Sequence, residues 1–181
     1  DGTTDDTAAF TLAVAAVNTA GGKLILPPGQ YVVAAGTIDI TYNGVQIIGA
    51  SKGDAAYPTP AYPAPTAIFI TGTGAGIRVR SQSVTLKDFR LSSNTARAAL
   101  SFDLQSPGIH VEAPDNSAND RADRCIVHDV RIDQQPGDGY LSVGPAIYAD
   151  LARIDIYNCK GFGFRFDPGL FGRCDGHEHL A

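Results

Sequence analysis

The sequence lacks several features that common protein classes require. Among its 181 residues there is no Met and no Trp, and there are only three Cys residues: Cys125, Cys159 and Cys174. An odd number of cysteines, none of them spaced as a close pair, is typical neither of a disulfide framework nor of a zinc site. We therefore expect the three side chains to be buried free thiols. Basic residues are also few, since 14 Lys and Arg against 19 Asp and Glu give a formal net charge of −5. Nucleic acid is therefore not expected as a partner, because phosphate binding needs a basic face.

Long hydrophobic runs are missing as well. No segment approaches the ~20 apolar residues that span a bilayer, so we expect no membrane insertion. Hydrophobic residues make up 44% of the chain and charged residues 18%, a balance typical of a folded domain. The length predicts one domain over residues 1–181. Because the chain starts at Asp1 rather than Met, we expect it to be a fragment of a longer protein.

Residues 5–20 are predicted to form the main helix. One narrow stripe of this segment is apolar and consists of Phe10, Ala13, Val14 and Val17. Thr4 or Asp5 can cap its start, and Gly21-Gly22 can end it. From there the hydrophobic period changes to two, which predicts the first strands within residues 23–50. A Pro- and Tyr-rich insertion follows at residues 51–66.

A pattern of alternating apolar residues, interrupted once by Asp or Asn, occurs three times. The interrupting residues are Asp88, Asp129 and Asn158. The side-chain parity flips there, which a flat strand cannot do without turning apolar side chains outward. A left-handed bend solves this problem, and Asp and Asn tolerate that conformation better than other non-Gly residues.

A second pattern precedes these copies, at residues 76–79, 108–111, 146–149 and 163–166. Short strands joined by bends and separated by variable loops predict a parallel β-helix through residues 67–166, with a loop or tail at 167–181. The helix at 5–20 would cover its open end. A β-sandwich or barrel is the alternative, but neither predicts a shared bend residue.

Two N-terminal stretches carry a family resemblance: DGTTDDTAAF at residues 1–10 and GGKLILPPGQY at residues 21–31. Together they resemble the opening of pectate-lyase-like proteins. The resemblance implies an all-β fold, a right-handed single-stranded parallel β-helix with an N-terminal capping helix. Within that superfamily it is nearest to bacteriophage tailspike and tail-fibre depolymerases, although secreted polygalacturonases, pectate lyases and alginate-modifying enzymes share the opening. The family's preceding DFGAxG strand is missing here, and the family usually has more coils.

Candidate catalytic residues lie near the C-terminus. GFGFRFDP at residues 161–168 resembles the GYGFDPHE motif of mannuronan C-5 epimerases, with Asp167 at the matching position. Phe164 replaces the tyrosine, and an insertion separates Asp167 from His177 and Glu178. In an extended segment Asp175 and His177 would share one face and could serve acid–base steps. The alternative for residues 175–179 is a solvated terminal loop.

Other acidic residues are weaker catalytic candidates. A glycoside hydrolase would need two carboxylates at a defined separation, and the loops offer Asp103, Glu112, Asp115, Asp120 and Asp123. For Asp88 and Asp129 we expect a structural role at the bend. No cofactor is predicted from the residues, and a calcium ion (Ca) follows from family analogy alone.

Candidate carbohydrate-binding residues are cationic or aromatic. Arg78, Arg131 and Arg165 occupy outward positions and could line an acidic glycan, as could Arg90 and Arg153. Tyr57 and Tyr62 could stack on sugar rings from the insertion. The alternatives are ordinary surface charges and a stiff surface loop.

These observations, together with the resemblance, predict a phage tail protein that recognises a bacterial surface polysaccharide and, as a depolymerase, would also cleave it. The resemblance implies a homotrimer and an extracellular location on the virion tail. A secreted lyase, hydrolase or epimerase is the first alternative. A non-catalytic adhesin or structural virion protein is the second.

Overall fold

The computed structural model describes residues 2–53, 66–112, 124–144 and 149–167. No helix within these ranges is long and apolar enough to cross a membrane. The helices and strands, in chain order, are α1 (Thr7–Ala20), β1 (Lys23–Ile25), β2 (Gly29–Ala34), β3 (Ile38–Ile40), β4 (Gln46–Ile48), β5 (Thr66–Thr71), β6 (Ile77–Val79), β7 (Thr85–Ser93), α2 (Thr95–Ala98), β8 (Ile109–Glu112), β9 (Ile126–Asp133), β10 (Tyr140–Val143), β11 (Asp150–Ala152), β12 (Asp155–Tyr157) and β13 (Phe164–Asp167).

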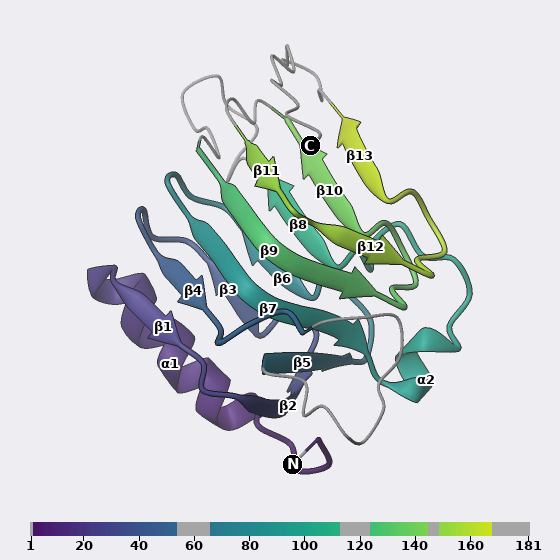
Figure 1. Ribbon diagram of the computed structural model, residues 1–181, viewed down its shortest axis with the longest axis horizontal. Coiled ribbons are helices and arrows are strands. Elements are labelled where there is room, and N and C mark those ends of the chain that lie inside the picture. The colour runs from purple at the N-terminus through teal and green to yellow at the C-terminus, as the bar shows by residue number, and fades with distance from the viewer. Residues whose placement is uncertain (1, 54–65, 113–123, 145–148, 168–181) are drawn as a thin grey trace.

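The strands form two sheets, and each strand pairs in parallel with its neighbours (Figure 1). Sheet B has the order β13-β10-β8-β6-β3, and sheet A contains the remaining strands. Each passage around the core adds one strand to sheet B, and it adds to sheet A either one long bent strand, such as β7 or β9, or two short ones, such as β4 and β5. This is the arrangement of a parallel β-helix, as the repeats predict.

The core consists of in-register columns of apolar side chains. In sheet B one inward column contains Ile38, Ile77, Ile109, Tyr140 and Phe164. In sheet A another contains Leu24, Ile47, Leu86, Val127 and Leu151. Burial of such stacked side chains is the main stabilising contribution, at roughly 25 cal/mol per Å² of apolar surface removed from water.

The predicted bends at Asp88 and Asp129 are confirmed. Their φ angles are 61° and 53°, in the left-handed region. Before Asp88, β7 pairs with β4, and after it the same strand pairs with β5. One bent strand therefore belongs to two flat stretches of sheet A, which explains the flip in side-chain parity.

The left-handed bend predicted at Asn158 is also confirmed, with a φ angle of 53°, but Asn158 is not the counterpart of Asp88 and Asp129. Ala152 is opposite His128, so Arg153 takes the place of Asp129, and its φ angle is 52°. Asn158 lies one turn later, opposite Gln134, whose φ angle is 57°. Arg153 was missed because Arg tolerates this conformation poorly, whereas Asn tolerates it well and favoured an alignment on Asn158.

The second repeat also needs one correction. The copies at 76–79, 108–111 and 163–166 coincide with β6, β8 and β13, but the strand between β8 and β13 is β10. The copy predicted at 146–149 falls mostly on residues 145–148, which lie outside the described residues. In β10 a polar Ser142 replaces the apolar residue of the pattern, which concealed this strand.

A column of glycines marks the true register of sheet B. Gly76, Gly108, Gly139 and Gly163 each precede one of its strands. A Cβ added at the first three would lie 2.7, 2.7 and 2.8 Å from the carbonyl oxygen of the glycine in the next coil. Only glycine allows the coils to approach this closely.

The helix α1 packs at the first-coil end of the core, beside β1, β2 and β3 (Figure 1). Its buried residues are Phe10, Val14 and Val17, which confirms the apolar stripe. It begins at Thr7, whose backbone N–H donates to Asp5 Oδ1 at 2.9 Å. Asp6 instead accepts from the Val32 N–H at 3.0 Å and ties the helix start to β2.

Two of the three thiols lie within the described residues. Cys125 is buried and free, and burial raises its pKa to about 12. Cys159 is also free and partly buried, and its pKa is raised to about 11, chiefly by burial. Cys174 lies outside the described residues.

Candidate functional site: the outer face of sheet B

The outer face of sheet B carries two rows of mostly charged side chains, which we call the charged face. The parallel register places Asp39, Arg78, His110, Leu141 and Arg165 side by side in the first row. Two residues further along each strand, the second row contains Arg80, Glu112, Val143 and Asp167. Three arginines and three carboxylates thus share one surface with a single histidine.

His110, Glu112 and Arg78 form a contact group at the centre of this face. Glu112 Oε1 lies 3.3 Å from Arg78 Nε, and Glu112 Oε2 lies 3.5 Å from His110 Nε2. Burial lowers the pKa of His110 and Arg78 lowers it further, whereas Glu112 acts in the opposite direction. His110 is therefore a neutral imidazole near neutral pH and can accept a proton.

Arg78 and Arg80 differ in what they can still bind. Arg80 holds Asp39 through both ends of its fork, with Nε 3.0 Å from Oδ1 and Nη2 2.5 Å from Oδ2. The hydrogen bonds that Arg80 donates to the Asp39 carboxylate raise the pKa of Arg80. The Arg78 side chain is 38% exposed and touches Glu112 through Nε, so its fork faces the surface with donors to spare.

Arg165 and Asp167 occupy the far end of the charged face, on β13. The Arg165 guanidinium lies 3.3 Å from the carboxylate of buried Asp138 and 5.0 Å from the centre of the Phe162 ring. Asp167 is exposed and is aligned with Val143 on β10, two strands from Glu112. That separation corresponds to roughly 10 Å between the two backbones.

The loop between β7 and β8 flanks the charged face and is anchored by buried Arg97. This side chain donates to Ser93 Oγ at 3.1 Å and to the carbonyl oxygens of Gly72 and Ser106 at 2.7 and 3.2 Å. Burial lowers its pKa to about 10. Asp103 accepts from Ser106 Oγ and from the Gln105 N–H, and these bonds lower its pKa. Asp103 therefore holds its own loop together.

The structure brings some of the predicted carbohydrate-binding residues together and separates others. Arg78 and Arg165 share the charged face, as do the acids Glu112 and Asp167. Arg131 lies on sheet A instead, 3.4 Å from Asp133 and 4.8 Å from the centre of the Tyr157 ring. Tyr57, Tyr62, Asp175, His177, Glu178, Asp115, Asp120 and Asp123 lie outside the described residues.

His110 was missed as a candidate, although a signal for it was present. The repeat at 108–111 places His110 in the outward position that Arg78 and Arg165 occupy in their own copies. His110 also lies beside Glu112, because side chains two residues apart on a strand point to the same face of the sheet. Asp138 and Phe162 had no such signal, because they lie in turns between strands.

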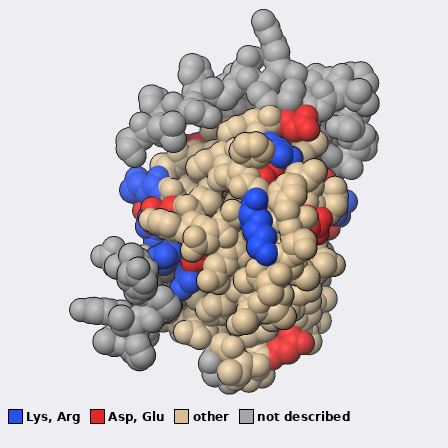
Figure 2. Space-filling view, turned by 90° about the vertical axis from the view of Figure 1, so that its right-hand side faces the viewer, with Lys and Arg blue, Asp and Glu red and all other residues tan. Residues whose placement is uncertain are grey.

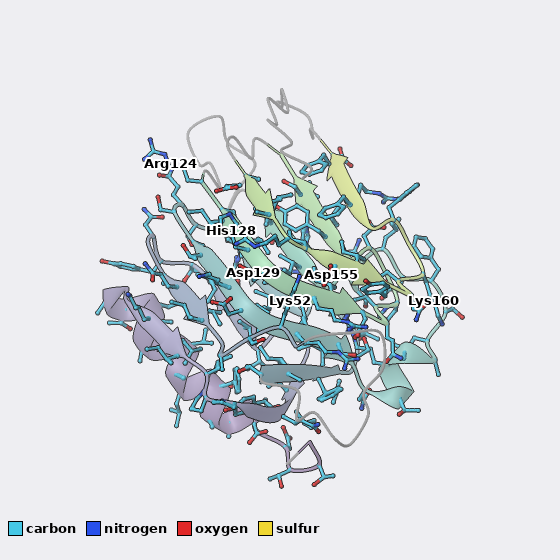
Figure 3. All side chains as sticks on the ribbon, viewed as in Figure 1. Lys52, Arg124, His128, Asp129, Asp155 and Lys160 are labelled. Carbon is cyan, nitrogen blue, oxygen red and sulfur yellow. The ribbon has the colours of Figure 1, made fainter. Side chains whose placement is uncertain are left out.

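A second charged cluster lies around the bends of sheet A, where Figure 3 shows Lys52, His128, Asp129 and Asp155 gathered. Lys52 Nζ lies 2.9 Å from Asp155 Oδ2, and His128 Nε2 lies 3.0 Å from Asp150 Oδ2. Arg153 pairs with both oxygens of Asp129 at 2.7 Å and lowers the pKa of that carboxyl. Opposite charges are matched here, which fits the expected structural role of Asp129.

Among the described residues, no group of three or more His, Cys, Asp or Glu side chains is arranged to hold a metal ion. Figure 2 shows charged side chains as separate blue and red patches on a mostly uncharged surface.

Comparisons with known proteins support the fold and give no information about the chemistry of the site. No protein-family model matches the chain, and no curated protein matches it by sequence. Among solved structures it is similar to the A-module of the Azotobacter vinelandii mannuronan C-5 epimerase AlgE6, with a TM-score of 0.54 and 21% identity. The match covers 92% of this chain and 49% of that one, so the chain spans about half the length of this structural neighbour. The likeness supports the parallel β-helix fold.

Proposed function

We propose that this chain is the β-helix part of a protein that binds and chemically modifies an extracellular polysaccharide along the charged face. The observation that carries the proposal is the contact group of His110, Glu112 and Arg78. A neutral histidine next to a carboxylate that also contacts an exposed arginine is a typical acid–base arrangement. The structural likeness to a polysaccharide epimerase module supports the same class of substrate.

The arrangement suits removal of a proton from the carbon next to a sugar carboxylate. Arg78 would bind that carboxylate and stabilise the charge that develops on it. His110 would accept the proton, and Glu112 would stabilise the resulting imidazolium. In a lyase the C–H electron pair then forms a double bond and expels the neighbouring glycosidic oxygen, which takes up a proton from the imidazolium or from water. In an epimerase the proton stays on His110, and a different proton, from water, is delivered to the opposite face of the ring.

Hydrolysis by a carboxylate pair has less support. The acids Glu112 and Asp167 lie on strands whose backbones are roughly 10 Å apart, and both carboxylate oxygens of Glu112 are engaged by Arg78 and His110. Retaining hydrolysis needs about 5–5.5 Å between carboxyl groups and inversion about 6.5–9.5 Å. Proton abstraction by His110 is therefore the favoured chemistry.

The biological setting belongs to the same proposal. The fold is a right-handed single-stranded β-helix with α1 as its N-terminal cap, carried by a homotrimeric phage tailspike or tail fibre that acts on a bacterial surface polysaccharide outside the cell. The N-terminal resemblance supports this setting. A secreted polysaccharide enzyme and a non-catalytic adhesin are the alternatives.

The test is to incubate the full-length protein with a panel of bacterial capsular and exopolysaccharides, and to follow chain length, reducing ends and near-ultraviolet absorbance together. We expect shortening with new absorbance, because β-elimination creates a conjugated double bond. His110→Gln should abolish it, whereas His128→Gln should retain it, since His128 pairs with a carboxylate in the same way but lies on sheet A. Binding without shortening or new absorbance is followed by NMR in deuterated water, where exchange of the proton next to the sugar carboxylate indicates an epimerase and no exchange favours the adhesin. Equal activity of H110Q and the wild type would exclude His110 as the base.

A further inference from the structure

Two ion pairs on the charged face join neighbouring strands diagonally. Across the parallel register, Asp39 on β3 lies directly beside Arg78 on β6. In the next row, Arg80 lies directly beside Glu112 on β8. Pairing straight across the strands, which are roughly 5 Å apart, would join these two couples. The structure has the crossed pairs instead, Arg80 with Asp39 and Arg78 with Glu112.

The contact with Asp39 decides which way the Arg80 fork points. Arg80 engages both carboxylate oxygens, through Nε at 3.0 Å and Nη2 at 2.5 Å. A two-point contact fixes the direction of the guanidinium as well as its position. Helix α1 holds the same segment of β3, because Asn18 Nδ2 donates to the Asp39 carbonyl oxygen at 2.7 Å and Asn18 Oδ1 accepts from the Thr41 N–H at 3.0 Å. Asp39 is therefore a fixed anchor for Arg80.

Glu112 is the carboxylate that Arg80 would reach without this anchor. The pKa of Arg80 is raised chiefly by its hydrogen bonds to Asp39, and the Glu112 charge raises it further, so the two charges already interact. The Glu112 oxygens contact Arg78 at 3.3 Å and His110 at 3.5 Å. A bidentate arginine occupies both oxygens of a carboxylate, so a second fork on Glu112 would displace the imidazole.

We propose that Asp39 is a positioning residue, which holds Arg80 away from Glu112. Glu112 therefore remains with His110 and Arg78, and the Arg78 fork stays open for the sugar carboxylate. The inference deepens the proposed function and rests on it for the effect on catalysis. The pairing itself can be tested without any substrate.

The pKa of His110 reports whether Glu112 stays beside the imidazole. Burial lowers this pKa most, Glu112 raises it, and Arg78 lowers it. On the other side β10 presents uncharged side chains to this face, those of Leu141 and Val143. Exchange of the imidazole C2 hydrogen for deuterium, read by peptide mass spectrometry at a series of pH values, gives the pKa of each histidine in the full-length protein.

Asp39→Asn should lower the pKa of His110 by roughly one pH unit, because Arg80 then turns to Glu112 and neutralises the carboxylate that raises it. On a polysaccharide of the panel that the wild type modifies, kcat should fall about tenfold, since the imidazolium loses its carboxylate partner. KM should stay nearly unchanged, because Arg78 still binds the sugar carboxylate. Asp39→Glu keeps a carboxylate and should restore most of both values.

Arg80→Gln separates this mechanism from a simple change of charge. D39N should lower the pKa of His110 in the wild type but not in R80Q, whereas fixed charges would act additively. The matched control is Asp129→Asn, which breaks a similar two-point pair with Arg153 on sheet A and should leave the pKa of His110 unchanged.

The outcomes separate the two proposals. If D39N leaves the pKa of His110 unchanged, or lowers it equally with and without Arg80, the positioning role is refuted. A lower pKa without a lower kcat refutes the effect on catalysis. If the wild type modifies no polysaccharide of the panel, the proposed function is wrong, and the pKa values still decide the pairing. The Asp39 and Arg80 side chains are 28% and 32% exposed, so losing their pair costs little stability, and circular dichroism checks that each variant retains its sheet structure.

Discussion

The glycine column of sheet B makes the sharpest prediction about stability. Gly108→Ala would place a Cβ 2.6 Å from Ile132 Cγ2 and 2.7 Å from the Gly139 carbonyl oxygen. Overpacking of this kind costs roughly 1–3 kcal/mol. The loss of chain entropy in the unfolded state opposes it by about 0.4–1 kcal/mol. The net expectation is a free energy of unfolding lower by about 1–2 kcal/mol, or a melting temperature lower by roughly 2–8 °C.

A glycine outside this column provides a matched control of opposite sign. At Gly29 the φ angle is not positive, and the nearest atoms to an added Cβ are those of the Tyr31 side chain, at 3.6 to 3.8 Å, which is ordinary contact. Gly29→Ala should therefore be neutral or slightly stabilising, because only the entropy effect remains. Urea unfolding followed by circular dichroism measures both variants. If G108A were as stable as G29A, close approach of the coils would not be the reason for glycine at Gly108.

Three further predictions concern single side chains. Arg153→Asn should raise the free energy of unfolding, because Asn tolerates the left-handed φ of 52° better than Arg does. A lower free energy of unfolding in urea would show that the pairing of Arg153 with Asp129 matters more. Cys125 should react with a thiol reagent at pH 8 only after denaturation, since burial raises its pKa to about 12, and rapid labelling of the native protein would contradict this. The pKa of His110 is lower in the folded protein than in the unfolded chain, so the unfolded chain binds the proton more readily. The free energy of unfolding should therefore fall as the pH drops below the ordinary histidine pKa of about 6.5. Urea titrations of the wild type and H110Q at several pH values should show a weaker acid dependence in the variant.

Much of the fold follows from local chemistry that sequence reveals. The stripe of α1, the first strands and the bends at Asp88 and Asp129 each depend on a property of the residue itself, such as apolar period or tolerance of positive φ. Arg153 could not be found this way, because its conformation is imposed by neighbouring coils against its own preference. Tertiary contacts override local tendency there.

The candidate site was harder to predict, because it depends on which residues of different coils become neighbours. Arg78 and Arg165 were found as outward residues, but Arg131 has the same local pattern and faces outward on the other sheet. Deciding between the sheets needs the register of every coil. The loops obscure that register, since they change the spacing between successive strands.

The corrected register of β10 also shows what divides the charged face. The displaced repeat would have put Tyr148 in its middle, whereas the structure has Leu141, which is only 7% exposed. Leu141 lies between His110 on one side and Arg165 on the other, in the same row. A side chain without hydrogen-bonding groups cannot relay a proton or share a charge between them. Arg165 therefore has no part in the acid–base step proposed at His110, and a polysaccharide chain that reached both residues would have to lie across Leu141.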